Sequence, residues 1–246
     1  MANTFSQIYI FKEKSSSMKK TALFLLLTII SIPVFAQKDK VYTSLEEALA
    51  NKEMVYQLSL EGQNLTKLPE SIGDLKNLIE LDLSFNKIEK IPESIGDLKN
   101  LIELDLSFNK IEKIPEVIGK LKNLRKIDVF KNQLNSLPKT IGNLRKLQKL
   151  ILGGNQLTNL PESIGNLKNL TDISLSINQL KGLPESIGNL KNLKWIGLEL
   201  NQLIALPKSI EGLVNLNHID LRENLQLPES EIIRIKKHLT NCHISF

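Results

Sequence analysis

The feature that most constrains this 246-residue chain is a repeat with a period of 23 residues. Prolines recur at this interval from Pro69 to Pro207, and six glycines keep the same spacing. Residues 70–92 are identical to residues 93–115. A fixed period of this length is typical of solenoids, in which each repeat buries its apolar face only against its neighbours. The repeat therefore sets the fold class before any local structure is considered.

Each unit carries the pattern L-x-x-L-x-L-x-x-N-x-L, as in residues 78–88 of the second copy. Leu81 and Leu83 alternate with polar neighbours, and this period of two predicts a short strand with one buried face. Pro92 fixes φ and has no N–H, which suits the start of a helical or 3-10 turn. Because parallel neighbouring strands need a crossover between them, the remaining residues of the unit are expected to supply it.

In this pattern the chain resembles the leucine-rich-repeat family, in the form with 23 residues per repeat. The L-P-x-x-I-G-x-L-x-N-L segment is similar to the repeats of Ras-regulating and plant intracellular leucine-rich-repeat proteins and of exported bacterial ones. The resemblance implies an α/β fold: a right-handed leucine-rich-repeat solenoid with a curved parallel β-sheet on the concave face and short helical or 3-10 turns on the convex face. The pattern departs from the family at its ends, where Gln63 stands in place of asparagine and the eighth copy closes early at Pro228.

One asparagine in each repeat is predicted to be structural. Stacked along the solenoid, its amide can satisfy backbone groups in the turn after each strand, where no sheet partner exists. The loss of one such side chain is expected to cost about 1–3 kcal/mol. The asparagine ladder consists of Asn86, Asn109, Asn132, Asn155, Asn178, Asn201 and Asn224.

Residues 1–36 are predicted to be a signal peptide. Residues 18–20 form a basic start, an apolar run of 14 residues follows at 21–34, and the cleavage point would precede Gln37. This order is typical of a secretory signal, with Met18 as the alternative translation start. An uncleaved N-terminal anchor is the other interpretation, although a spanning helix needs roughly 20 apolar residues.

The repeats need caps, because the terminal units would otherwise expose core. Residues 37–54 are expected to form an N-terminal helical cap, since Ser44 and Glu47 have capping-box spacing. Residues 55–228 hold eight leucine-rich repeats, and residues 229–246 are expected to form a C-terminal cap helix and strand.

The net charge gives little support for a nucleic-acid partner. The chain has 32 Lys+Arg and 27 Asp+Glu, a formal charge of +5, but the leader carries four lysines and one glutamate. From Gln37 onward the chain is therefore only +2. Nucleic-acid binding requires a strongly basic surface, and this net charge does not indicate one. We therefore expect no nucleic-acid partner.

No residue pattern points to catalysis or to a metal. His218 is the only histidine inside the repeats, and its charged neighbours at 220–223 form no triad of nucleophile, base and orienting group. His238, Cys242 and His243 could in principle ligate a metal, but cap packing with Cys242 facing the core is the favoured interpretation. We therefore expect no enzyme activity, no cofactor and no metal.

The variable strand positions are expected to form the binding surface. They face the concave side, and over eight repeats they include ten acids and four bases, which favours a basic partner. Trp195, the only tryptophan, is either an interface anchor or packed at the edge, and Phe85 and Phe108 either bind or pack on the turn. The candidate partner-binding residues are Glu80, Asp82, Phe85, Glu103, Asp105, Phe108, Lys126, Asp128, Phe130, Lys149, Ile151, Asp172, Trp195, Glu199 and His218.

These observations favour a non-catalytic, exported protein, secreted or in the cell envelope (periplasm or surface). It is expected to bind a protein or peptide partner of basic character through its concave face. A membrane would be involved only for export or if the leader is uncleaved. The alternatives are a cytoplasmic signalling adaptor resembling the Ras-regulating branch, and a surface glycan-binding protein.

Overall fold

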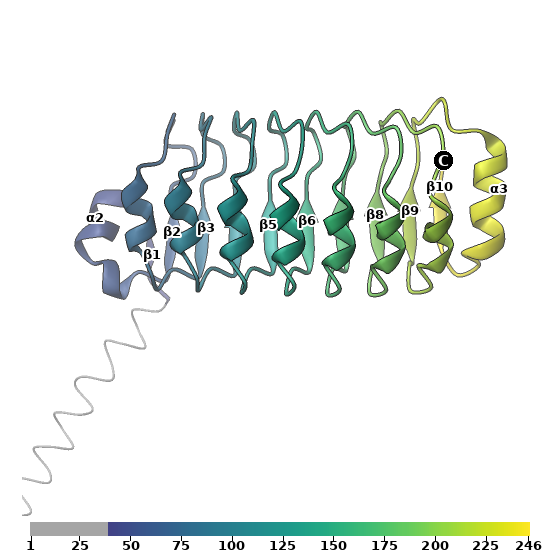
Figure 1. Ribbon diagram of the computed structural model, residues 1–246. Coiled ribbons are helices and arrows are strands. Elements are labelled where there is room, and N and C mark those ends of the chain that lie inside the picture. Colours follow the sequence, from purple (N-terminus) through teal and green to yellow (C-terminus); the bar gives the residue numbers. More distant parts are fainter. Residues whose placement is uncertain (1–38) are drawn as a thin grey trace, which may run out of the picture. The chain divides into compact units, whose positions relative to one another are not determined.

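The computed structural model describes residues 39–246, and the predicted signal peptide lies outside these described residues. Residues 41–246 form one compact unit, in which ten short strands follow one another in chain order and make a single parallel sheet (Figure 1). A row of 3-10 turns packs over one face of this sheet, one turn beside the next (Figure 1). The fold is the α/β leucine-rich-repeat solenoid that the sequence predicts.

The strands recur because each starts at the same position of a repeat. Their inward side chains pair in register, Leu81 with Leu104 and Leu104 with Ile127, and all three are buried. Burial of one such side chain contributes about 1.5–3 kcal/mol. The strands are β1 (Val41–Tyr42), β2 (Gln57–Ser59), β3 (Glu80–Asp82), β4 (Glu103–Asp105), β5 (Lys126–Asp128), β6 (Lys149–Ile151), β7 (Asp172–Ser174), β8 (Trp195–Gly197), β9 (His218–Asp220) and β10 (His243–Ser245).

A 3-10 turn follows the proline of seven repeats. Pro161, for example, lies directly before its turn with φ of −70°, and its missing N–H costs nothing there. Glycine at the fourth turn position allows close stacking, because a Cβ on Gly165 would lie 2.5 Å from the carbonyl oxygen of Ser186 in the next turn. The turns are η1 (Lys52–Met54), which precedes the first repeat strand, and η2 (Glu70–Asp74), η3 (Glu93–Asp97), η4 (Glu116–Lys120), η5 (Lys139–Asn143), η6 (Glu162–Asn166), η7 (Glu185–Asn189) and η8 (Lys208–Gly212).

In the second to eighth repeats, one buried asparagine ties the turn after the strand to the preceding repeat. Asn109 Nδ2 donates to the carbonyl oxygens of Leu83, Leu106 and Ser107 at 2.9, 3.1 and 3.2 Å. Its Oδ1 accepts from the N–H of Ile88 at 2.9 Å. The Leu83 and Leu106 carbonyls and the Ile88 N–H lie where the sheet ladder has ended, so the amide supplies partners there, whereas the Ser107 carbonyl also accepts from the Phe85 N–H. The same set of bonds is made at Asn86, Asn132, Asn155, Asn178, Asn201 and Asn224.

A second asparagine ladder, which the sequence analysis missed, runs on the N-terminal side of the strands. Asn100 Nδ2 donates to the carbonyl oxygen of Lys76 in the preceding repeat at 2.9 Å. Asparagines 77, 123, 169, 192 and 215 make the corresponding bond. In the fifth repeat Lys146 takes this slot, and its Nζ donates to Asn123 Oδ1 at 2.8 Å instead.

The N-terminal end of the sheet holds a strand that the sequence analysis did not predict. β1 pairs with β2 through Tyr42 and Leu58, and Tyr42 is buried. Helix α2 (Leu45–Ala50) follows, and the Glu47 N–H donates to Ser44 Oγ at 3.3 Å, which is one of the two bonds of a capping box. A two-residue strand is too short for an alternating pattern to reveal.

At the C-terminal end, helix α3 (Glu229–His238) takes the place of a further 3-10 turn. Glu211 stands where the earlier repeats have glycine, and its carboxylate pairs with Arg234 of α3. Arg234 also pairs with Glu231 at 2.8 Å. Cys242 packs half-buried against the core, and burial raises the pKa of its thiol to about 11.

The asparagine ladder can be tested at a central repeat. We expect Asn132→Ala to lower the free energy of unfolding by about 1–3 kcal/mol, because it leaves the buried Ile111 N–H without a partner and removes one of the two amide donors to the Leu106 carbonyl. Urea unfolding followed by circular dichroism measures this change. Gln133→Ala, at the exposed neighbour, is the control and should have little effect. Equal unfolding midpoints for the two variants would contradict the assigned role.

Candidate functional site

The outward side chains of the strands and of the residues directly after them form the surface that we call the sheet face. Because the strands pair in register, equivalent side chains line up across the repeats. Eleven of the fifteen candidate residues lie on β3–β9, and Phe85, Phe108, Phe130 and Glu199 lie just after a strand. The structure divides them into two groups, one over β3–β6 and one over β7–β9.

Carboxylates dominate the sheet face over β3–β5. Glu80 pairs with Glu103, and Asp82, Asp105 and Asp128 pair in one line across three strands. The four carboxylates of β3 and β4 border a shallow hollow of about 260 Å³, together with Lys126 of β5. Like charges at this spacing repel one another, so the line costs stability.

The aspartates of this line also bond the backbone. Asp105 Oδ1 accepts from the N–H and the hydroxyl of Ser107 at 2.9 and 2.7 Å, and Asp128 Oδ1 accepts from the Phe130 N–H at 2.9 Å. Burial raises the pKa of Asp128, with the charge of Asp105 adding to the effect and the Phe130 N–H and Lys126 opposing it. These aspartates therefore have a structural role, which the sequence analysis did not assign.

An aromatic cluster lies beside the carboxylates. The rings of Phe85 and Phe108 stack with centroids 4.2 Å apart, and Phe108 meets Phe130 edge-on at 5.5 Å. The Lys131 ammonium lies 5.0 Å from the Phe108 centroid, within cation–π range. Phe85 and Phe108 were expected either to bind a partner or to pack on the turn. The structure is compatible with both roles, because the rings pack on each other while Phe85 stays 53% exposed.

The residue before each ladder position has a left-handed backbone in all eight repeats. Two of these slots hold glycine, Gly62 and Gly154, both with φ of 67°. The other six hold larger side chains with φ between 51° and 58°, a region that costs a non-glycine residue about 1–2 kcal/mol. Ile177 and Leu200 are 45% and 48% exposed there. The six are Phe85, Phe108, Lys131, Ile177, Leu200 and Glu223.

Trp195 lies across its own strand rather than pointing into solvent. A Cβ added to Gly197 would come within 3.0 Å of Trp195 Cζ2 and 2.9 Å of Ser176 Oγ, so the indole covers this glycine. Trp195 is half-buried, with His218 in register on β9. His218 in turn stacks on His243 with ring centroids 5.1 Å apart. Ring side chains thus occupy the first outward position of β8, β9 and β10.

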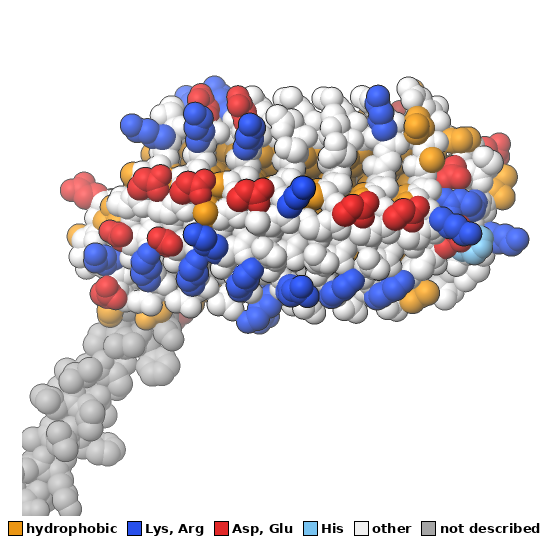
Figure 2. Space-filling view, viewed as in Figure 1, with side chains coloured by type: hydrophobic (Ala, Val, Ile, Leu, Met, Phe, Trp, Pro, Cys, Tyr) orange, Lys and Arg blue, Asp and Glu red, His pale blue; other side chains and the backbone are white. Residues whose placement is uncertain are grey.

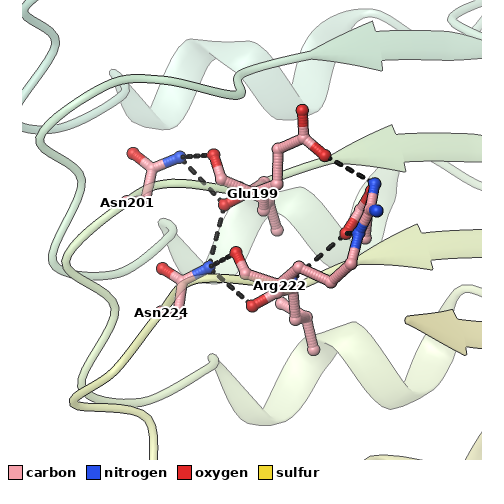
Figure 3. Close-up of polar contacts among 7 residues, drawn as sticks. Glu199, Asn201, Arg222 and Asn224 are labelled. Carbon is pink, nitrogen blue, oxygen red and sulfur yellow. Dashed lines mark hydrogen bonds and ion pairs between the residues drawn. The ribbon is translucent and has the colours of Figure 1, made fainter. Parts of the chain in front are cut away.

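Arg222, which follows β9, joins the carboxylates of Asp220 and Glu199, and Figure 3 shows its contact with Glu199. Its guanidinium donates to Asp220 through Nε and Nη2, at 2.9 and 2.6 Å, and to Glu199 through Nη2 at 2.8 Å. The hydrogen bond from Arg222 lowers the pKa of buried Asp220 to about 2. The hydrogen bond shared with Asp220 raises the pKa of Glu199, helped by burial and opposed by Arg222. The network orders the sheet face here rather than leaving a reactive group.

The sequence analysis counted Lys131, Arg222 and Gly197 among the variable positions of this face but did not select them as candidate binding residues. Alignment of the repeats could have revealed the left-handed slot, because glycine occupies it twice. Among the described residues, no group of three or more His, Cys, Asp or Glu is placed to hold a metal ion. Within 39–246, no helix is long and apolar enough to cross a membrane.

A family model described as a leucine-rich repeat region matches residues 6–130 and 103–181. The chain belongs to the leucine-rich-repeat family. The comparison with curated proteins finds no match.

Solved leucine-rich-repeat structures are similar to this chain. A leucine-rich-repeat protein of Leptospira interrogans is 40% identical over 84% of this chain and 52% of its own, with a TM-score of 0.75. An internalin of Listeria monocytogenes is 25% identical over 80% of this chain and 56% of its own, with a TM-score of 0.72. The ectodomain of an Arabidopsis thaliana membrane receptor kinase, in complex with CASPARIAN STRIP INTEGRITY FACTOR 2, is 28% identical over 70% of this chain and 25% of its own, with a TM-score of 0.58. The chain thus spans about half the length of the first two.

The packing of Trp195 on Gly197 can be tested through the single tryptophan. We expect Gly197→Ala to push the indole into water, because the new Cβ would overlap the ring. Tryptophan emission should shift to longer wavelength and acrylamide quenching should increase. Gly182→Ala is the control, since its nearest atom would be 3.7 Å away. Unchanged emission in Gly197→Ala would contradict the described position of the ring.

The Asp220–Arg222 pair predicts a pH-dependent stability. The folded pKa of Asp220, about 2, lies below the ordinary value of 3.8, so its charged form stabilises the fold above about pH 4 and this contribution disappears as the pH falls towards 2. We expect Asp220→Asn to lose about 1–2 kcal/mol of unfolding free energy at pH 6 and almost none near pH 2. Urea unfolding at several pH values measures this. A loss of the same size at both pH values would contradict the ion-pair explanation, and Asp74→Asn is an exposed control.

Proposed function

We propose that this protein is a non-catalytic binding module, secreted or held in the cell envelope, that binds a protein or peptide partner on its sheet face. The observation that carries the proposal is the left-handed slot after each strand. Phe85, Ile177 and Leu200 occupy this strained conformation and remain about half exposed.

The glycine-containing repeats show what the backbone of this slot requires when no large side chain is present. Gly62 and Gly154 have the backbone that the turn requires at no steric cost, so folding alone would favour glycine in every copy. Large apolar side chains add strain and gain little burial. Strain retained at exposed positions supports a role in binding, because the cost is offset only when a partner covers these side chains.

The rest of the sheet face supports a protein partner. Eight repeat strands at about 4.8 Å spacing make a surface wide enough for a protein interface of standard size. Aromatic, apolar and charged side chains are all present on it, which is the composition of interfaces with anchors and a polar rim. Among the solved structures, the receptor-kinase ectodomain is in complex with CASPARIAN STRIP INTEGRITY FACTOR 2, which supports binding as the general use of this fold.

Two observations support a location outside the cytoplasm and the absence of catalysis. The basic start and apolar run of residues 18–34 have the order of an export signal, and the similar structures include a receptor ectodomain. The strongly shifted pKa values of Asp220 and the Cys242 thiol have structural causes, ion pairing and burial. Neither belongs to a nucleophile with an adjacent base.

The test separates binding from stability. We expect the double variant Ile177→Gly and Leu200→Gly to keep or raise the free energy of unfolding, by up to about 1 kcal/mol per site, because glycine relieves the left-handed strain. Partner affinity should fall at least tenfold. The full chain, immobilised by a C-terminal tag, captures partners from envelope and medium fractions, and affinity is then measured with the captured partner. Mass spectrometry of the native chain in the same fractions shows whether it begins at Gln37.

The matched control is Gln179→Ala with Gln202→Ala, at exposed polar positions of the same two repeats. It should leave partner affinity unchanged. Affinity that is equal for the glycine variant and the wild type would overturn the assignment of the binding surface.

A further inference from the structure

Basic side chains concentrate in two neighbouring repeats. Residues 120–149 contain nine Lys+Arg and one acid, Asp128, so this stretch has a net charge of +8. The whole chain is only +5, and the remainder is therefore net acidic. The repeats are otherwise closely similar, so this excess is a local feature of the fourth and fifth copies.

Four of these residues lie at or just before the N-terminal ends of β5 and β6, and we call them the basic strip: Arg125, Lys126, Lys146 and Lys149. Lys126 pairs directly with Lys149 across the two strands. Arg125 precedes Lys126, and Arg125 and Lys146 line one end of a groove of about 280 Å³ along this edge of the sheet. Figure 2 shows further Lys and Arg side chains along the lower edge of the turn-covered face.

The strip works against folding at two points. Lys126 and Lys149 are like charges directly opposite each other on adjacent strands, an arrangement that destabilises a sheet. Lys146 replaces the asparagine that six other repeats use to bind a preceding carbonyl. Its ammonium bonds a side-chain oxygen of Asn123 instead. This repeat lacks a stabilising ladder bond and adds repulsion between like charges. Local features that reduce the stability of a fold are expected mainly at functional sites.

The carboxylates on both sides limit what can bind. In the same outward row, Glu103 lies on one side of Lys126 and Asp172 on the other side of Lys149. In this outward row the positive charge is thus two strands wide, about 10 Å at the usual spacing of about 4.8 Å. A long polyanion along the sheet would meet carboxylates on either side and be repelled. A short run of acidic residues on a folded partner fits the strip, with basic residues opposite Glu80, Glu103 and Asp172.

We propose that the basic strip binds a short acidic segment of the protein partner. This inference rests on the proposed function and refines it. The partner has alternating charge, with an acidic segment set between basic ones, rather than the uniformly basic character expected from the net charge of the face. The strip fixes the register of the partner along the repeats, because only one position along the sheet matches its acidic segment.

The experiment uses a fluorescein-labelled hexaglutamate peptide and the full chain, with binding followed by fluorescence anisotropy at low and at physiological salt. We expect binding that weakens with salt and falls at least tenfold in the double variant Lys126→Glu and Lys149→Glu. The control, Lys90→Glu with Lys113→Glu, makes the same change of net charge at exposed lysines away from the strip. It should stay within about twofold of the wild type. Circular dichroism verifies that both variants are folded.

Equal losses in the two variants would overturn the site, since net charge alone would explain them. Heparin or single-stranded DNA that binds the strip while hexaglutamate does not would overturn the assignment of a peptide segment. The Ile177→Gly and Leu200→Gly variant should bind hexaglutamate like the wild type. A failure of the strip is therefore distinguishable from a failure of the proposed function, which that variant tests with the captured partner.

Discussion

The hydrogen bonds of the buried asparagine ladder are the interaction on which the rest of this structure depends. Each amide donates to three carbonyls and accepts from one N–H near the end of the sheet ladder, as Asn109 does with Leu83 and Ile88. The chain can then leave the strand through a tight left-handed residue without burying unpaired backbone groups. That residue points outward at the rim of the sheet face. In each such turn, the ladder asparagine and the outward left-handed residue of the proposed binding surface are therefore adjacent in the chain.

Neighbouring repeats hold the stack together mainly through their buried core, their asparagine ladders and their 3-10 turns, which lie away from the outward strand positions. Ladders of asparagine bond the backbone at both ends of the strands, and glycines such as Gly165 allow the turns to touch. Because these positions carry the stability, the outward positions can vary. Even the paired Asp82 and Asp105 are tolerated, since each accepts a backbone N–H that would otherwise lack a partner. Charge patterns that oppose folding can thus persist on this face.

The sequence predicted most of the fold because the repeat multiplies each local signal. The strands, the proline before each turn and the core positions all follow from one unit read in eight copies. The N-terminal strand was missed because Val41 and Tyr42 lie outside the repeat and are too few to show a period. The asparagines of the second ladder recur in the sequence as K-N-L, which resembles an ordinary exposed segment. Their role becomes apparent only when the acceptor carbonyl in the preceding repeat is known, as for Asn100 and Lys76.

The site was harder to predict, since its features depend on relations between side chains of different residues. The position of Trp195 depends on the absence of a Cβ at Gly197, two residues away on the same strand. The left-handed slot is hidden within a single repeat, because six copies hold a larger side chain there, and only the alignment of all copies shows the two glycines. Charge was predicted as a sum over the face, whereas the structure arranges it in blocks: acidic over β3 and β4, basic at Lys126 and Lys149, and mixed beyond.

The identity of residues 70–92 and 93–115 has a consequence for how this surface can change. Loss or gain of one such unit by unequal recombination would leave every junction in phase, because each copy ends where an equal copy begins. Each step would remove or add one strand, two carboxylates equivalent to Glu103 and Asp105, and one phenylalanine. The acidic part of the face can therefore change length between generations in steps of one strand spacing, while the basic strip and the C-terminal cap remain as they are.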